Sequence, residues 1–256
     1  MNPPMPFSRT YDGDEPQRIN KWLAQSGVCS RREAEAFIAD GLVAIDGETV
    51  SDPGRKITRG QTLTLRDAAG AALGAQLTVV VHKPVGVVSA HPERGQTEAA
   101  QLLTPQNLWR AKTEAPAGKS LPPLGRLDRD SRGLLMLSED GVLAKAVIGP
   151  ESTLDKEYLV GVDGRIDGRM LMRLRHGLVL DGKALRRADV EEIGPQRLRF
   201  VLTEGRNRQI RRMCEAVGLN VVDLLRIRIG PIELGDLPEG CWRPLAPGER
   251  AALLSS

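Results

Sequence analysis

Leu124-Gly-Arg-Leu-Asp-Arg-Asp-Ser-Arg-Gly133 is the segment on which the interpretation of the whole chain depends, and an apolar run at 134–137 follows it directly. Three arginines surround Asp128 and Asp130, and a glycine stands near either end, which predicts a loop leading into a buried strand. A carboxylate among guanidinium groups is kept ionised by their charge and can act as a nucleophile or bind a developing cation. The arginines favour a substrate that carries phosphate. Because charged loops are usually only solvated, the rest of the chain has to support this interpretation.

Composition limits the class of protein. Of the 256 residues, 41% are hydrophobic and 27% charged, which is typical of a soluble globular protein, and the net charge is +3. The sequence has no apolar run near the roughly 20 residues of a membrane span and no secretory signal layout at its start, so we expect a cytoplasmic protein. Three cysteines without a Cys-x-x-Cys pair and three isolated histidines predict neither a disulfide framework nor a metal site.

The N-terminal part of the chain predicts a small helical unit. Residues 1–16 hold four prolines and few apolar residues, so we expect a flexible tail there. Apolar residues at 19, 22 and 23 have helical spacing, and Ser30 and Glu33 form a capping-box pattern at the start of a second helix. An Asp-Gly pair at 46–47 predicts a hairpin, and a strand at 61–65 would complete the unit.

Basic residues gather on this unit. Arg31 and Arg32 fall in the first turn of the second helix, where they add positive charge to free backbone N–H groups. Arg18 and Lys21 lie on the outward face of the first helix. The layout over 17–65 resembles the S4 RNA-binding domain, and this resemblance implies that these four side chains bind structured RNA.

The remainder of the chain predicts a second domain. Residues 66–76 are rich in glycine and alanine and are interpreted as a linker, so the second domain covers 77–250. Strands are expected at 77–81, 134–138, 156–161, 198–202 and 221–229. Apolar positions 210, 213, 214 and 217 predict a helix, and four arginines lie near its start, without acidic neighbours within the cluster.

Three motifs then occur in a fixed order behind the S4-like part. They are Gly125-Arg-Leu-Asp128, Lys156-Glu-Tyr158 and Glu204-Gly-Arg-Asn-Arg-Gln-Ile-Arg-Arg-Met213. Together they resemble the RsuA/RluB/RluE/RluF family of pseudouridine synthases over most of residues 17–247, and most of all its members that act on 23S rRNA. The resemblance implies isomerisation of uridine to pseudouridine in RNA, without cofactor or metal. It also implies an α+β fold: a small S4 RNA-binding domain plus a catalytic domain with a mixed, largely antiparallel sheet.

The resemblance also implies roles for individual residues. Asp128 is the essential catalytic residue, which either attacks covalently or abstracts a proton on the way to a glycal. Tyr158 stacks on the target base and assists loss of the C5 proton. Leu224 contacts the other side of the base, although a plain core position explains it equally well. Asp130 is expected to be structural.

Several arginines receive roles in the same way. The family places a basic residue against the catalytic aspartate, and our first candidate is Arg206 and our second Arg208. Arg126 stands two residues before the aspartate and is expected to fill the gap that an everted base leaves in its stack. Arg211 and Arg212 are predicted to bind RNA.

Two alternatives remain open on the sequence alone. The same chemistry could act on 16S rRNA or tRNA, or the chain could be a non-catalytic RNA-binding or ribosome-assembly factor. We expect a monomer.

Overall fold

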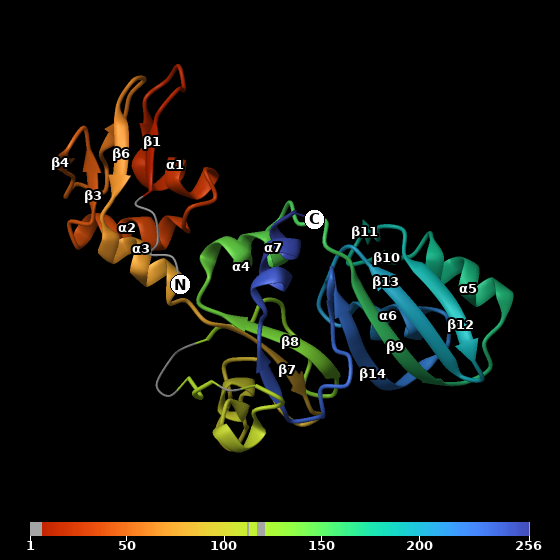
Figure 1. Cartoon of the computed structure of the whole chain (residues 1–256). Coiled ribbons are helices and arrows are strands. Elements are labelled where there is room, and N and C mark those ends of the chain that lie inside the picture. Colours follow the sequence, from red (N-terminus) through yellow and green to blue (C-terminus); the bar gives the residue numbers. More distant parts are fainter. Residues whose placement is uncertain (1–6, 112, 117–120, 256) are drawn as a thin grey trace. The chain divides into compact units, whose positions relative to one another are not determined.

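The computed structural model describes residues 7–111, 113–116 and 121–255. Its chain divides into two compact units (Figure 1). The first runs up to Leu77 and includes Ser138–Lys145, and the second comprises Thr78–Leu137 and the chain from Ala146 onward.

The first unit packs helices against a small antiparallel sheet. Its main sheet has the strand order β1-β6-β3-β4, and β2 pairs separately with β5. The predicted capping box is present at the start of α2, where the Ser30 side chain accepts from the Glu33 amide and the Glu33 carboxylate accepts from the Ser30 amide. The elements are α1 (Ile19–Gln25), α2 (Arg31–Ala39), α3 (Asp67–Gly74), β1 (Ser8–Thr10), β2 (Gln17–Arg18), β3 (Val43–Ile45), β4 (Glu48–Thr49), β5 (Lys56–Ile57) and β6 (Thr62–Leu65).

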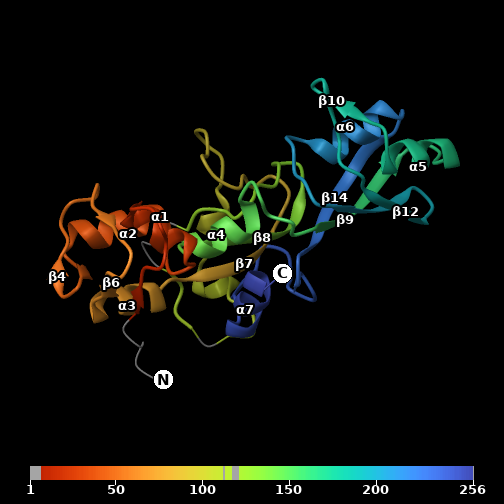
Figure 2. The same cartoon turned by 90° about the horizontal axis from the view of Figure 1, so that it is seen from above.

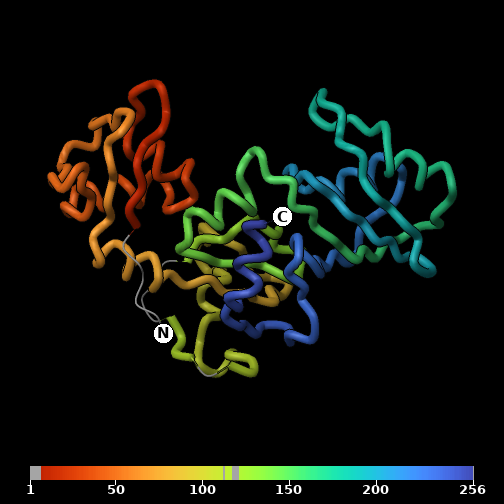
Figure 3. Tube along the Cα trace, turned by 45° about the horizontal axis from the view of Figure 1, so that its top comes forward, coloured from red at the N-terminus to blue at the C-terminus, as the bar shows by residue number. Residues whose placement is uncertain are grey.

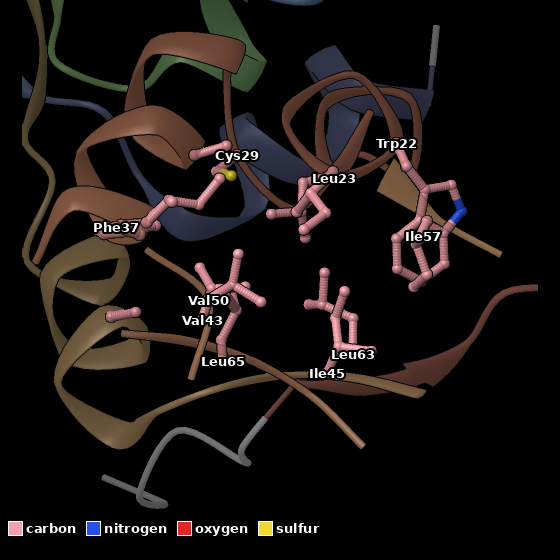
Figure 4. Packing of buried hydrophobic residues seen from close by; sticks show 14 of the residues in the cluster. Trp22, Leu23, Cys29, Phe37, Val43, Ile45, Val50, Ile57, Leu63 and Leu65 are labelled. Carbon is pink, nitrogen blue, oxygen red and sulfur yellow. The ribbon is translucent and has the colours of Figure 1, made fainter. Parts of the chain in front are cut away.

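The core of this unit lies between its helices and its sheet (Figure 4). Leu23 from α1 and Phe37 from α2 point toward strand residues such as Ile45 and Leu63. These four side chains are buried. The apolar spacing in the sequence therefore does mark the inner faces of the two helices.

Two segments of this unit differ from the prediction. Residues 8–10, expected in a flexible tail, form β1, which pairs antiparallel with β6, and Tyr11 is buried beside Trp22. The rest of that tail up to residue 6 lies outside the described residues. The expected linker at 66–76 contains helix α3, because its small alanines allow close packing and Ala69 joins the core.

The second unit is built on one large sheet with the order β12-β13-β9-β14-β8-β7-β16, and β15 pairs with β14. In addition, β10 and β11 form a hairpin. Two short 3₁₀ turns lie at Ala99–Leu102 and Pro105–Asn107. The strands are β7 (Thr78–Lys83), β8 (Arg132–Ser138), β9 (Lys156–Asp163), β10 (Val179–Leu180), β11 (Lys183–Ala184), β12 (Asp189–Gly194), β13 (Arg197–Leu202), β14 (Asn220–Ile229), β15 (Ile232–Glu233) and β16 (Trp242–Pro244), and the helices are α5 (Gly168–Arg175), α6 (Gln209–Ala216) and α7 (Pro247–Ser255). Helix α4 (Gly141–Ile148) begins in the part of the chain assigned to the first unit and ends in the second.

Helices cover part of this sheet. Helix α5 lies beside β12 and α6 against β14, on the same side of the sheet (Figure 2). At the other end, β7 pairs with β16, so strands from the start and the end of this unit run side by side (Figure 3). The strand pairs are mostly antiparallel, while β8 and β14 run parallel. The predicted α+β class with a mixed, largely antiparallel sheet is confirmed. Among the described helices, none has the length and apolarity needed to cross a membrane.

The centre of the sheet brings distant motifs together. In the register of β14, Arg226 lies opposite Tyr158 of β9 on one side and Gly133 of β8 on the other. Gly133 has a φ of +112°, and a Cβ at this position would lie 2.3 Å from the backbone oxygen of Arg226. Only glycine permits this close approach, so the last residue of the 124–133 segment fixes how the segment meets β14.

Candidate active site

A pocket of about 830 Å³ opens on the second unit. Its walls come from the loop before β8, from β9 and β14, and from the β13–α6 connection with the first turn of α6. The predicted site residues that line it are Asp128, Tyr158, Leu224, Arg126, Arg206, Arg208 and Arg211. Arg212 does not contribute to this lining. The topology thus brings all three sequence motifs to one pocket.

The loop that carries Asp128 is held by hydrogen bonds to a neighbouring segment. The hydroxyl of Ser89 donates to the Leu127 carbonyl at 2.7 Å and accepts from the Leu127 amide at 2.9 Å. The Gly86 amide donates to the Arg129 carbonyl at 2.8 Å, and the Arg129 side chain returns a bond to the Gly86 carbonyl at 3.2 Å. The backbone of both neighbours of Asp128, Leu127 and Arg129, is therefore held by hydrogen bonds.

Lys83 in turn fixes that neighbouring segment. Its ammonium is fully buried and donates to the carbonyls of Pro84 at 2.8 Å and Val87 at 2.7 Å. Burial lowers the pKa of Lys83 to about 8, against the opposing influence of Asp128 and Asp130, which raise it. The Lys-Pro-x-Gly sequence at 83–86 thus stabilises the loop that carries Asp128.

One arginine connects the two carboxylates of the loop. A guanidinium nitrogen of Arg208 lies 3.5 Å from Asp128, whose side chain is 29% exposed. The same guanidinium donates two bonds to Asp130, at 3.0 and 2.9 Å. The hydrogen bonds from Arg208 hold the pKa of Asp130 below its ordinary value. Asp130 therefore orients Arg208, and Arg208 places a positive charge beside Asp128.

The backbone of Arg208 is itself unusual. It stands at the N-cap of α6 with φ +49° and ψ +33°, in the left-handed region that few residues other than glycine adopt. Strain of this kind persists only where the surroundings enforce it, and it is concentrated at functional sites. Here the paired contact with Asp130 fixes the side chain of the strained residue.

Our first candidate for the partner of Asp128, Arg206, has other contacts. Its guanidinium donates to the carbonyls of Leu180, Lys183 and Ala184 at 3.3, 3.1 and 2.7 Å. It also lies 3.4 Å from a carboxylate oxygen of Glu204. Among the described residues, Arg206 makes no ion pair with Asp128. The structure thus places the second candidate, Arg208, beside the aspartate, because Arg206 points back to the β10–β11 hairpin.

The arginines near the start of α6 have hydrogen-bond and ion-pair partners, although the sequence shows no acidic residue within their cluster. Arg211 donates to the Asp130 carbonyl at 2.7 Å and to the Val221 carbonyl at 3.1 Å, and its side chain is only 14% exposed. Arg212 makes a two-bond contact with Asp181, at 2.9 and 2.7 Å. The acidic partners come from distant parts of the chain, so the local sequence gave no sign of them.

The expected base-contacting residues all line the pocket. Tyr158 and Leu224 are 8% and 6% exposed and lie on adjacent strands. Arg126 is exposed at the pocket edge, and its guanidinium has no hydrogen-bond or ion-pair partner among the described residues. A tyrosine, a leucine and a free arginine at the rim form a suitable pocket for a planar base.

The basic residues of the first unit have a different environment. Arg18, Lys21, Arg31 and Arg32 are all exposed. Within the part of the chain that the structure describes, none of them has a carboxylate within 4 Å. Their charge is available to an anionic partner.

Several polar residues of the pocket were not identified as site residues from the sequence. Lys156, His91 and Arg226 line the pocket, and Arg226 is buried to 1% exposure. Lys156 belongs to a quoted motif, and its position two residues before Tyr158 in a strand, hence on the same face, could have identified it. Nothing in the sequence identifies Arg226 as a pocket residue, because a charged residue within an apolar strand is normally predicted to lie on the exposed face.

Two further kinds of group could supply chemistry, namely metal-binding clusters and the two buried cysteines. In the described chain, no group of three or more histidine, cysteine or acidic residues has the arrangement of a metal site. Burial raises the pKa of the Cys29 and Cys214 thiols to about 12, so neither supplies a thiolate nucleophile at neutral pH.

Comparison with known proteins places these features in a family. A family described as RNA pseudouridylate synthase matches residues 77–216, and the S4 domain family matches residues 17–63. The dual-specificity RNA pseudouridine synthase RluF of Escherichia coli (strain K12) is 34% identical over 242 residues, which cover 92% of this chain and 78% of that protein. Ribosomal large subunit pseudouridine synthase B of Bacillus subtilis (strain 168) is 32% identical, covering 91% of this chain and 93% of that protein. A crystal structure of a pseudouridylate synthase is similar with a TM-score of 0.64 and 26% identity, covering 92% of this chain and 99% of that one.

Proposed function

The chain belongs to the RNA pseudouridylate synthase family, and from this membership we propose that it converts a specific uridine of 23S rRNA to pseudouridine with Asp128 as the catalytic residue. The choice of large-subunit rRNA is supported by the motifs and by the similarity to a relative named as a ribosomal large subunit enzyme. We further propose that the enzyme acts in the cytoplasm as a monomer, with the S4 domain beginning near residue 17 and the catalytic domain near residue 77.

The observation that carries the proposal is the pairing of Asp128 with Arg208 in a pocket that Tyr158 also lines. The guanidinium of Arg208 lies 3.5 Å from the Asp128 carboxylate and attracts it. Whether that carboxylate attacks covalently or removes a proton, it has to be reachable from the pocket. Its side chain is 29% exposed, which meets this condition.

The remaining residues supply binding and orientation. We assign Tyr158 and Leu224 to the two faces of the target uracil, and Arg126 to the position that the everted base leaves in the RNA. Eversion costs a few kcal/mol, which a replacing side chain and the pocket contacts offset.

The exposed cations Arg18, Lys21, Arg31 and Arg32 contact RNA phosphates. Arg206 and Arg211 support the pocket walls through the contacts described above, while Arg212 holds Asp181 in the turn of the β10–β11 hairpin.

Release of tritium tests this function. Transcripts of 23S rRNA, 16S rRNA and tRNA labelled at C5 of uridine are incubated with the purified chain, because formation of the C1′–C5 bond expels the C5 hydrogen. We expect release from 23S rRNA, and mapping of the product gives the position. One relative is named as a dual-specificity enzyme, so release from tRNA as well would extend the proposal, whereas release from 16S rRNA or tRNA alone would correct the target.

The catalytic assignment needs a matched pair of variants. Asp128→Asn preserves size and removes the charge, and we expect it to release no tritium above background. Asp163→Asn makes the same change at an exposed residue outside this pocket and should retain full activity. Release by Asp128→Asn at the wild-type rate would overturn the role of Asp128. Salt-sensitive RNA binding by the wild-type chain without any new pseudouridine would instead indicate a non-catalytic RNA-binding factor.

A further inference from the structure

One wall of the pocket carries two cations that the proposed roles do not use. Lys156 is at the start of β9, two residues from Tyr158, and both side chains line the pocket. Its ammonium group donates to the Leu154 carbonyl at 3.2 Å. An ammonium group has three donors, so Lys156 can still donate to a molecule in the pocket.

The second cation is Arg226, opposite Tyr158 in the sheet register. Its Nε donates to the Leu134 carbonyl at 2.7 Å and its Nη1 to the Arg126 carbonyl at 3.5 Å. Its Nη2 is buried and has no partner among the described residues. A buried guanidinium nitrogen without an acceptor costs free energy because it has lost its hydration. An acceptor brought by a ligand would remove this cost.

The two cations make no ion pair among the described residues. The adjacent Asp155 is bound by both terminal nitrogens of Arg228 at 2.7 and 2.8 Å. Burial lowers the pKa of Lys156, repulsion from Arg226 lowers it further, and the charge of Asp155 raises it. Lys156 and Arg226 therefore differ from the arginines around α6, each of which has a carboxylate partner.

The isomerisation creates a negative charge that can meet this wall. The C1′–N1 bond breaks and its electron pair leaves with the uracil, where it is shared between N1, C5, O2 and O4, while C1′ either bonds the Asp128 carboxylate or forms a glycal as the sugar loses a proton. The ring then turns, C5 bonds to C1′, C5 loses its proton and N1 gains one. Between these two bond changes the detached uracil is an anion with two oxygen acceptors. It needs no other reactant.

We propose that Lys156 and Arg226 form a subsite that binds a carbonyl oxygen of the detached uracil and stabilises its negative charge. This inference rests on the proposed function, since it assigns residues to an intermediate of that reaction. Lys156 and Arg226 line the same pocket as Tyr158 and Leu224 and come from the same two strands, so a base bound there has its carbonyl oxygens near the two cations. Donors fixed in advance where charge develops are an effective means of lowering a barrier.

A backbone phosphate is the competing occupant, and the position of the wall argues against it. Arg226 lines the pocket but is only 1% exposed, so a single base oxygen can approach it more easily than a phosphodiester with its two sugar substituents. A phosphodiester is charged before the reaction as well as during it, so phosphate contacts would be made equally in the ground state. A site for the detached uracil would act only after the C1′–N1 bond breaks. Kinetics distinguishes the two cases.

The test is Lys156→Met, with Lys145→Met as a matched control on the exposed side of α4, outside the pocket lining. We measure kcat and KM for tritium release, and RNA affinity by filter binding. Removing one such donor typically costs about 10²-fold in kcat or more, so we expect a hundredfold fall in kcat with KM and affinity within about twofold of wild type. Lys156→Arg, which keeps the charge, should recover most of the lost rate, and Lys145→Met should behave as wild type.

Arg226→Lys provides a second measurement, with the melting temperature recorded to separate folding from chemistry. A fall in kcat without a fall in melting temperature supports the subsite. An unchanged kcat in Lys156→Met, or a raised KM with kcat unchanged as a phosphate contact requires, would overturn it. The wild-type chain in the same assay reports on the proposed function: no release from wild type contradicts both proposals, whereas full activity of Lys156→Met contradicts this one alone.

Discussion

Arginines at the start of a helix have opposite environments in the two units of this protein. In the first unit, Arg31 and Arg32 begin α2, are exposed, and have no carboxylate partner among the described residues. In the second, Arg211 and Arg212 lie in α6 and contact Asp130 and Asp181. The sequence patterns are alike, but only the first presents free charge.

This difference distinguishes arginines that are free to bind an anion from arginines that hold the structure of the protein. Exposed, unpaired cations attract phosphate over long range, and their contribution falls as salt rises. A two-bond arginine–carboxylate contact instead fixes geometry, as Arg208 and Asp130 do beside Asp128. The first unit is therefore expected to determine how tightly RNA binds, and the arginines of the second how well the bound uridine reacts.

The largest expected effect is on the cation beside Asp128. Arg208→Ala removes the positive charge 3.5 Å from the aspartate, and we expect kcat to fall by about 10²- to 10³-fold, as on loss of a fixed electrostatic contact in an active site. RNA affinity should change little, because this guanidinium is bound to Asp130. Tritium release at saturating RNA, with filter binding alongside, measures both quantities.

Arg206→Ala is the control for that variant, since it removes the same group two residues away. The Arg206 guanidinium donates to three carbonyls of the β10–β11 hairpin. Losing these contacts should lower the free energy of unfolding by about 1–3 kcal/mol. We expect a melting temperature lower by several degrees and a much smaller loss of kcat. The assignment of the aspartate's partner would be reversed if Arg206→Ala lost more activity than Arg208→Ala.

An intermediate effect is expected at Asp130, which acts through Arg208. Asp130→Asn keeps the shape but weakens the two bonds that orient the guanidinium, so kcat should fall about tenfold with KM nearly unchanged. Asp130→Glu, which keeps the charge, should recover part of the rate. A purely structural role would leave kcat unchanged at temperatures where the variant is folded.

The pH dependence of stability tests the same contact. Hydrogen bonds from Arg208 hold the pKa of Asp130 below its ordinary value, so the unfolded chain binds this proton more readily than the folded one. The contribution is therefore fully present above the ordinary pKa of about 4 and is lost as pH falls through the lower folded value. Melting temperatures between pH 6 and pH 3 should fall less steeply for Asp130→Asn. The effect is small, because Asp130 is 47% exposed and solvent screens the pair.

Much of the fold could be predicted from the sequence because local signals agree with the tertiary structure. The capping box at Ser30 and the alternation at 198–202 mark elements whose buried faces match the pattern. The prediction failed at 66–76, where a run of small residues looked like a linker. Such a run allows a helix to pack closely, and only the position of the neighbouring core decides which of the two forms.

The site was predictable in part for the same reason. Motif residues such as Asp128 and Tyr158 were found because family motifs name them, and they line one pocket. The ion pairs were not found, since Arg208–Asp130 and Arg212–Asp181 join residues 78 and 31 positions apart. Arg226 was missed because nothing in an alternating strand indicates that a charged side chain is buried.

The smallest expected effect is on RNA binding by the first unit, and it tests the opening comparison directly. Arg31→Ala or Arg32→Ala should weaken binding several-fold and reduce the slope of log affinity against log salt by about 0.7–0.9 if each contacts one phosphate. Arg212→Ala, which removes the same group from a contact with Asp181, should leave the slope nearly unchanged. The wild-type rate at saturating RNA should persist in Arg31→Ala and Arg32→Ala, because neither residue lines the pocket. Equal slope changes for Arg32→Ala and Arg212→Ala would mean that Arg212 also contacts RNA. A carboxylate partner in the folded chain would then not be enough to distinguish structural arginines from RNA-binding ones.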